Sequence, residues 1–172
     1  WMATDFTRER ILNADATTVS VGHYEGGVYN NYWVLIFSYP ENSHTEDYRQ
    51  EVLNLVNAQR AKYGLTALEM GDDNLTAAAQ TRAEEIAVVN SHVRPDGSKC
   101  FTVLKDYGVT DTPTGENAAW GSVSPEEVVN AWMNSEGHRA NILNPEARKM
   151  SVGYYYNSNS TWGHQWIQIF TK

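Results

Sequence analysis

The stretch Trp132-Met133-Asn134-Ser135-Glu136-Gly137-His138-Arg139 is the last of three short strings that decide how this chain folds. Ser91-His92-Val93-Arg94-Pro95-Asp96-Gly97 and Gly115-Glu116-Asn117-Ala118-Ala119 precede it in the sequence. An aromatic run, Trp166-Ile167-Gln168-Ile169-Phe170, follows it near the end of the chain. Each string alone is weak evidence, but the three in this order with the closing run form a specific pattern.

Helix signals dominate the region before and between these strings. Ser43-His44-Thr45-Glu46 has the spacing of a capping box, so a helix should begin there. Tyr63-Gly64 should end it, since glycine accepts the left-handed turn that follows many helices. A second helix is expected from about Asn74 to Asn90, with a stripe of small apolar side chains that lets a neighbouring layer approach closely.

The later part of the chain combines one more helix with two strands. Ser124-Pro125-Glu126-Glu127 repeats the capping box, and the helix it starts should run toward Gly137, which puts His138 at its C-terminal end. Met150–Tyr156 and Gln165–Phe170 are rich in strand-forming residues and predict an antiparallel hairpin. Helices first and strands last indicate an α+β fold.

With these strings in this order, the chain resembles the CAP superfamily (cysteine-rich secretory proteins, antigen 5 and pathogenesis-related 1). The resemblance is to the disulfide-free, SCP-like extracellular domain found in bacteria, and it runs from about Glu46 to Lys172. It implies a three-layer α-β-α sandwich with a small central antiparallel sheet. It also implies an extracellular domain, either secreted or attached to the cell surface.

The beginning of the chain repeats part of its end. When Trp1 is aligned with Trp132, identical residues recur at a constant offset of 131 in 11 of 24 positions. Residues 1–39 are therefore predicted to be a degenerate partial repeat of the C-terminal third of the CAP-like domain, 40–45 a linker, and 46–172 the complete domain. The repeat is either the tail of a preceding domain in a tandem array or a structural part of it. Its apolar strands need cover, which predicts packing on the complete domain or self-association through residues 1–39.

Composition excludes several classes of partner. The net charge is −8 and no run of Lys or Arg is present, which argues against binding to nucleic acid. No apolar stretch reaches the roughly 20 residues that span a bilayer, so no membrane span is expected. Cys100 is the only cysteine, so no intrachain disulfide can form, and we expect it to be a small buried residue rather than a nucleophile.

The resemblance also implies a cleft in which histidines and acidic residues gather and can bind a divalent metal such as zinc. His92 and Glu116 match two of these positions, and His138 supplies an imidazole through the bacterial Gly-His-Arg form of the motif. We therefore expect His92, Glu116 and His138 to be the metal ligands, a donor set that zinc accepts. Glu136 and His164 are peripheral candidates, because each lies one residue away from the position that the family uses.

A purely structural interpretation of the same residues stays open. His138 and Arg139 would then neutralise the C-terminal end of the predicted helix, where cations are favoured. Glu116 would pair with Arg94 or Arg139.

Three functions are compatible with this sequence. We favour a binding domain whose ligand is a lipid, a cell-wall glycan or a protein partner. The alternatives are a hydrolase that uses a metal or Glu116 as general base in the same cleft, and a structural module of a tandem surface array. No activated nucleophile is visible, so the sequence favours binding over catalysis.

Overall fold

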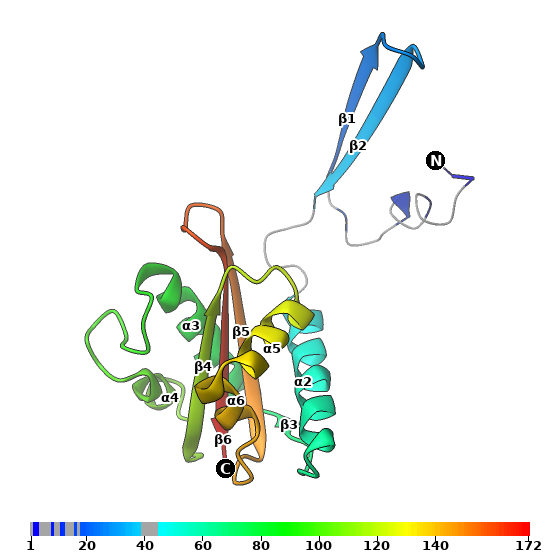
Figure 1. Ribbon diagram of the computed structural model, residues 1–172. Helices are drawn as coiled ribbons and strands as arrows, with labels where there is room; N and C mark the ends of the chain where they lie inside the picture. Colours follow the sequence, from blue (N-terminus) through cyan, green and yellow to red (C-terminus); the bar gives the residue numbers. More distant parts are fainter. Residues whose placement is uncertain (1, 4–7, 9–10, 13–15, 17, 39–44) are drawn as a thin grey trace. The chain divides into compact units, whose positions relative to one another are not determined.

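The computed structural model describes residues 2–3, 8, 11–12, 16, 18–38 and 45–172. The chain divides into two compact units, residues 1–43 and 44–172, and each is considered by itself. In the first unit, β1 (Thr18–Glu25) and β2 (Asn31–Ser38) form an antiparallel hairpin (Figure 1). Of the predicted linker, residues 40–45, all but Thr45 lie outside the described residues.

The second unit alternates helices and strands. Its elements, in chain order, are α2 (Thr45–Lys62), β3 (Glu69–Met70), α3 (Asp73–Val88), a 3-10 turn (Cys100–Thr102), α4 (Val103–Asp106), β4 (Pro113–Trp120), α5 (Pro125–Asn134), α6 (Glu136–Ile142), β5 (Lys149–Asn157) and β6 (Gly163–Thr171). Gly64 has a φ of +70°, which confirms the predicted end of the first helix.

One four-stranded sheet lies at the centre of this unit, in the order β3-β5-β6-β4. β6 pairs antiparallel with both β5 and β4, so the predicted hairpin is confirmed. The two-residue strand β3 pairs parallel with β5, a departure from the all-antiparallel sheet that we expected. This short parallel pair arises because the chain between α2 and α3 passes along the free edge of β5.

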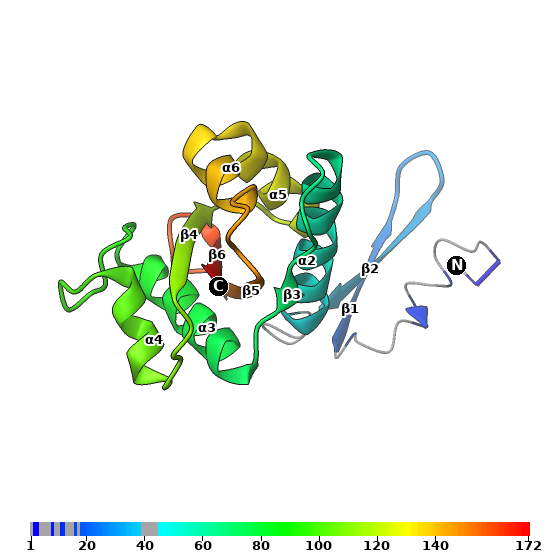
Figure 2. The same cartoon turned by 90° about the horizontal axis from the view of Figure 1, so that it is seen from below.

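Helices cover both faces of the sheet, which confirms the three-layer α-β-α sandwich. In Figure 2, α3 and α4 lie on one side of the strands and α5 and α6 on the other. The packing agrees, because Ala118, Ile167 and Ile169 of the sheet pack in a core with α3 and α4. Trp166 and Phe170 belong to a second core with α2 and α5. The alternation of side chains along each strand thus supplies two cores from one sheet.

The small-residue stripe of α3 packs closely on the sheet, as predicted. A Cβ atom added to Gly153 of β5 would lie only 2.0 Å from the carbonyl oxygen of Ala79. No side chain fits in that space, so the glycine is required by the approach of the helix backbone. Ala78, Ala79 and Ala83 are all fully buried at this interface.

The helix that begins at Ser124 is shorter than predicted. The Ser124 hydroxyl accepts a hydrogen bond from the Glu127 amide at 3.3 Å, as a capping box requires. The helix ends at Asn134, however, because Ser135 adopts an extended backbone (φ −98°, ψ 125°) and a second helix, α6, begins after it. The prediction that His138 lies at the C-terminal end of the helix is therefore wrong. His138 lies in the first turn of α6. Arg139, the next residue, donates a hydrogen bond to the Met133 carbonyl near the end of α5.

Candidate functional site

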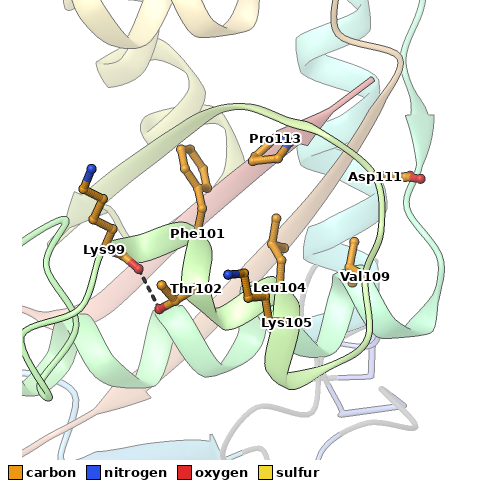
Figure 3. A pocket seen from close by; sticks show the side chains of 8 residues that line it. All are labelled: Lys99, Phe101, Thr102, Leu104, Lys105, Val109, Asp111 and Pro113. Carbon is orange, nitrogen blue, oxygen red and sulfur yellow. Dashed lines mark hydrogen bonds between the residues drawn. The ribbon is translucent and has the colours of Figure 1, made fainter.

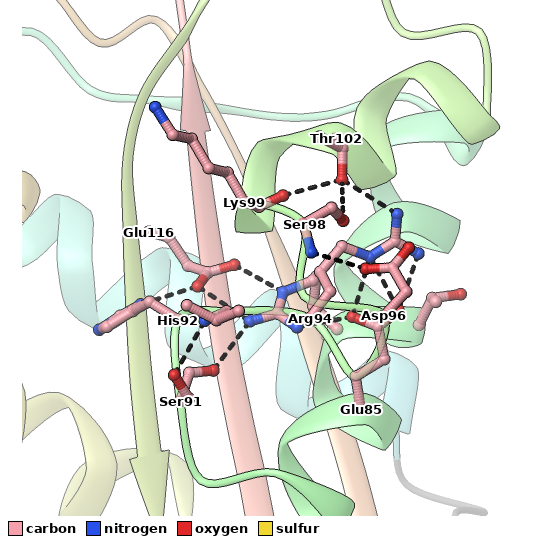
Figure 4. A network of polar contacts seen from close by, with 12 residues as sticks. Glu85, Ser91, His92, Arg94, Asp96, Ser98, Lys99, Thr102 and Glu116 are labelled. Carbon is pink, nitrogen blue, oxygen red and sulfur yellow. Dashed lines mark hydrogen bonds and ion pairs between the residues drawn. The ribbon is translucent and has the colours of Figure 1, made fainter.

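Glu116, on β4, is the centre of a polar network drawn in Figure 4. Its side chain is only 2% exposed and accepts hydrogen bonds from Arg82 of α3, at 3.0 Å from Nε and 3.3 Å from Nη2. Arg82 itself is fully buried and also pairs with Glu85 at 2.6 Å. The carboxylate that the sequence identified is thus held in a buried ion pair by an arginine that the sequence interpretation missed.

His92 contacts the same carboxylate, at the oxygen Oε1 that also accepts from Nη2 of Arg82. Its Nδ1 lies 2.8 Å from Oε1 of Glu116, while the side chain as a whole is 53% exposed. With Nδ1 directed to the buried carboxylate, Nε2 is the ring nitrogen left for a ligand. The predicted pairing of His92 with Glu116 is therefore present as a direct hydrogen bond.

The loop that follows α3 fixes the position of His92. The carbonyl of His92 accepts a hydrogen bond from the Cys100 amide at 3.1 Å, which closes the loop. Arg94 anchors its centre through two partners, Glu85 at 2.8 Å and Asp106 at 2.7 Å. Because Arg94 is engaged there, the predicted alternative that it pairs with Glu116 is wrong.

The charges of this pair are set by their contacts. The hydrogen bond to Glu116 raises the pKa of His92 above its usual value, against an opposing effect of burial. Burial alone would raise the pKa of the Glu116 carboxyl, but the hydrogen bonds from His92 and Arg82 outweigh it and leave that pKa below its usual value. Glu116 is therefore a stable anion, and His92 gains the proton more readily than a free histidine.

His138 lies near this pair. Its pKa is lowered, first by burial and then by the positive charge of His92, so the two imidazoles influence each other. The α6 backbone is held against β4 by Asn117, whose Nδ2 donates to the His138 carbonyl at 3.1 Å. Asn141 in turn donates to Oδ1 of Asn117 at 2.8 Å. Asn117 therefore braces the backbone of α6 against β4 with side-chain hydrogen bonds.

The two peripheral candidates lie elsewhere. The Nδ1 atom of His164 lies 2.8 Å from the hydroxyl of Tyr154, and burial lowers the pKa of this imidazole. Ile169 is the β6 residue that pairs with Glu116, so His164 is five positions, about 17 Å, further along the strand. Glu136 is exposed at the start of α6, and no hydrogen bond found among the described residues joins it to Glu116.

Cys100 is a site neighbour that the sequence interpretation set aside. Burial, followed by the charge of Glu116, raises the pKa of its thiol to about 11. A thiol with this pKa stays protonated at neutral pH and is a poor nucleophile. Cys100 therefore contributes to the surroundings of Glu116 without reactivity of its own, in line with the expectation that it is not a nucleophile.

The donor set does not favour zinc in the arrangement described. Within residues 18–38 and 45–172, no three His, Cys, Asp or Glu side chains are grouped as metal ligands. Both oxygens of Glu116 already accept hydrogen bonds from Arg82, and Nδ1 of His92 is directed to the same carboxylate. A cation at Glu116 would have to compete with a buried guanidinium, so the predicted ligands His92, Glu116 and His138 do not form a ready metal site.

A cavity of about 320 Å³ lies beside the loop that carries Cys100. Figure 3 shows its side chains, which come from the 3-10 turn, α4 and the segment that leads into β4. The lining is apolar at its base and carries two lysines, and its members are Lys99, Phe101, Thr102, Leu104, Lys105, Val109, Asp111 and Pro113. Asp111 is neutralised by Lys149 at 2.7 Å, so the lining has a net positive charge. The sequence strings gave no indication of this cavity.

The sandwich, with a buried Glu on its edge strand and a His from the loop after α3, defines a CAP-type domain. The sequence model of the Cysteine-rich secretory protein family (CAP) matches residues 53–170, and the chain belongs to this family. The uncharacterized protein YkwD of Bacillus subtilis is 42% identical over 122 residues, which is 70% of this chain and 47% of that protein. The uncharacterized membrane protein YlbC of Bacillus subtilis is 33% identical over 115 residues, 64% of this chain and 33% of that protein. The chain thus spans less than half the length of these relatives.

Solved structures share the fold. An extracellular protein containing an SCP domain from Bacillus anthracis superposes with a TM-score of 0.66 at 24% identity, over 81% of this chain and 47% of that one. An outer surface protein from Borrelia burgdorferi gives a TM-score of 0.66 at 23% identity, over 77% of this chain and 96% of that one. In the part of this chain that the structure describes, no helix is long and apolar enough to cross a membrane.

Proposed function

We propose that this CAP domain works outside the cell by binding an anionic ligand at His92. The observation that carries the proposal is the exposed imidazole of His92 held at Nδ1 by the buried Glu116. A protonated imidazole fixed in this way presents Nε2–H as a charged donor, and charge-assisted hydrogen bonds to carboxylate or phosphate are the strong ones. The extracellular location is supported by solved relatives described as extracellular or outer-surface proteins.

The neighbouring cavity supports an anionic ligand with an apolar part. Lys99 and Lys105 bring positive charge to its lining, in a chain whose net charge is −8. Phe101 and Leu104 give it apolar walls. Lys99 and Phe101 flank Cys100, whose thiol pKa is raised by burial and by the charge of Glu116, so the cavity begins next to the polar network. A ligand with an acidic group and a hydrophobic portion matches both features.

The same geometry argues against hydrolysis with Glu116 as general base. A base works best with a pKa near the working pH, and the pKa of Glu116 lies below that of an ordinary carboxylate. Both oxygens of Glu116 already accept hydrogen bonds from Arg82, which compete with the contact that a base would make to a water. Binding without catalysis is therefore the function that the contacts favour.

A pelleting assay tests the proposal. The purified chain is mixed with bacterial cell walls or with anionic lipid vesicles, and the bound fraction is measured at pH 6 and pH 8. We expect binding to one of the two to be stronger at pH 6 and to fall at least fivefold in His92→Gln. Glu136→Gln, a change in an exposed carboxylate outside the network, is the matched control and should bind normally.

Equal binding by His92→Gln and the unchanged chain would contradict the proposal. So would hydrolysis of a cell-wall or ester substrate that His92→Gln abolishes while folding stays intact, since this result would assign His92 to catalysis. The two pelleted materials distinguish the source of the anion. Vesicles carry the anion on a lipid, and cell walls carry it on a polymer.

A further inference from the structure

The β1–β2 hairpin has the same strand register as the β5–β6 hairpin of the complete domain. Val19 pairs with Phe37 as Met150 pairs with Phe170, and Gly22 pairs with Val34 as Gly153 pairs with Ile167. The strands of the small unit therefore present side chains to the same two faces as β5 and β6. A one-residue slip would exchange the faces, so this agreement carries information about what each face is built to contact.

The centre of one hairpin face is almost identical to the centre of the β5 and β6 face that packs on α3. On β5 and β6 these central positions hold Ser151, Gly153, Tyr155, Ile167 and Ile169. Their counterparts in the hairpin are Ser20, Gly22, Tyr24, Val34 and Ile36. Among these five positions the only difference is Val for Ile, which removes one methyl-sized group. At the ends of the face, Thr18, Tyr32 and Ser38 stand at the positions of Lys149, Gln165 and Thr171.

The opposite face keeps Val21, Trp33 and Phe37 at the positions of Val152, Trp166 and Phe170. It differs where His23 and Glu25 stand at the positions of Tyr154 and Tyr156, and where Leu35 stands at the position of Gln168. Two aromatic groups that pack toward α2 and α5 in the complete domain are thus replaced by polar side chains. The α3-equivalent face is distinguished by the glycine at its centre, not by its overall composition.

The contacts within the hairpin do not require a glycine at position 22. A Cβ atom at Gly153 would meet the Ala79 carbonyl at 2.0 Å, whereas one at Gly22 would meet only the Val34 side chain at 4.0 Å. Glycine in a strand interior weakens the strand unless something approaches closely. Its neighbours on this face, Tyr24 and Ile36, are 65% and 62% exposed. The hairpin therefore keeps a notch and an apolar surround that no other described residue of this unit fills.

We infer that this face of the hairpin is a docking surface for an α-helix with a stripe of alanines, packed as α3 packs on β5 and β6. The partner helix needs small side chains where its backbone approaches Gly22, and larger apolar residues on either side. α3 meets this need with Ala78 and Ala79 between Leu75 and Ile86. The stripe of α3 is itself buried under β5 and β6, and the other described helices of the complete domain also pack in its two cores, so the docked helix belongs to another polypeptide.

Charge agrees with a helix of this kind. Residues 18–38 contain no Lys or Arg and a single acidic residue, Glu25, at the end of β1. α3 itself carries Arg82 on its stripe, paired with Glu116 of β4, whereas no carboxylate stands on this face of the hairpin. The partner helix must therefore have an uncharged stripe, so that no charge is buried without a partner. Specificity would come from shape, through the notch at Gly22.

A helical peptide with the α3 sequence is the probe. It spans residues 72–89 and carries Arg82→Leu, which makes the stripe uncharged, and Val88→Lys, joined to Glu84 by a lactam bridge; both bridged positions are exposed on α3. Added to the ¹⁵N-labelled full chain, it should shift the amide signals of Gly22 and Val34 in a saturable way. We expect a dissociation constant in the millimolar range or below, as for a single helix on a small surface.

Matched variants test the notch. Gly22→Val in the full chain and Ala79→Leu in the peptide should each weaken binding at least tenfold, since each fills the space that the helix backbone needs. Val19→Met, on the opposite face and copying Met150, should leave binding unchanged.

Three results would overturn the inference. The first is the absence of any shift at millimolar peptide, and the second is unchanged binding by Gly22→Val. The third is a concentration-dependent dimer of the chain alone that Gly22→Val abolishes, because a second copy would then be the occupant of this face.

Discussion

Replacing Glu116 by glutamine removes the carboxylate that both Arg82 and His92 contact while keeping the size of the side chain. The amide keeps one oxygen acceptor in place of two, so its NH2 group is left facing a donor of Arg82 or His92. Removing one partner of a buried ion pair costs about 3–5 kcal/mol, because a charge stays buried without compensation. Arg82 keeps its contact with Glu85 at 2.6 Å, so we expect about 3 kcal/mol, at the lower end of that range.

Urea unfolding at pH 7 measures this loss as a lower midpoint with an unchanged slope. A second measurement isolates the site, since NMR titration of the His92 imidazole should show its pKa falling toward the ordinary value once the hydrogen bond to the carboxylate is gone. Glu136→Gln removes the same charge from an exposed position and should change neither quantity.

A loss of less than about 1 kcal/mol in Glu116→Gln would refute the reasoning, because it would mean that Arg82 is not held by this carboxylate in solution. An unchanged pKa of His92 would refute the second step. Either result would also remove the basis for a fixed, charged His92 at the binding site.

Three further predictions concern the packing and the charges. Gly153→Val should prevent folding of the complete domain, since its side chain would overlap the Ala79 carbonyl; circular dichroism and thermal melting check this. Tyr154→Phe should lower stability by about 1 kcal/mol through loss of the hydroxyl contact with His164, and should leave ligand binding unchanged in the pelleting assay. The stability difference between the unchanged chain and Glu116→Gln should be largest between about pH 4.3 and 6.5. It should shrink as acid protonates Glu116, whose pKa is lowered, and as base deprotonates His92, whose pKa is raised. If urea unfolding gave the same stability difference between the two proteins at every pH, this prediction would be contradicted.

The fold could be predicted from local signals that act over a few residues. The capping residue Ser124, the left-handed Gly64 and the strand-forming runs of the last hairpin all appear in the structure at their expected places. Such signals are reliable because each satisfies backbone groups that the element leaves unpaired. The family resemblance added the arrangement in layers, which local signals do not specify.

The break before α6 shows the limit of periodic patterns. The sequence around Ser135 carries no proline and its only glycine, Gly137, lies inside α6, so nothing in the periodicity indicated that the helix would stop. Serine is common at helix boundaries, and Ser135 takes such a position, although its side chain makes no capping hydrogen bond. The direction of His138 depends on this single extended residue, which is why its place was predicted wrongly.

Arg82 was missed for a different reason. It lies on the buried stripe of α3, between Ala79 and Ile86, where an arginine is an anomaly in an apolar pattern. A buried arginine needs a carboxylate partner, and Glu116 is that partner. The anomaly was readable in the sequence, but the partner is 34 residues away, and only the fold brings the two together.

The position of β4 explains why the site can be both rigid and open. β4 is an edge strand paired only with β6 in the sheet, so its consecutive residues reach the two helical layers from the free edge. Glu116 reaches Arg82 of α3 on one side, and Asn117 binds the backbone of α6 on the other. The α3 layer and the α6 layer are therefore both bonded to β4, the strand that carries Glu116, the partner of His92. His92 itself stays half exposed over this fixed base, and a fixed base lowers the entropy lost when a ligand binds.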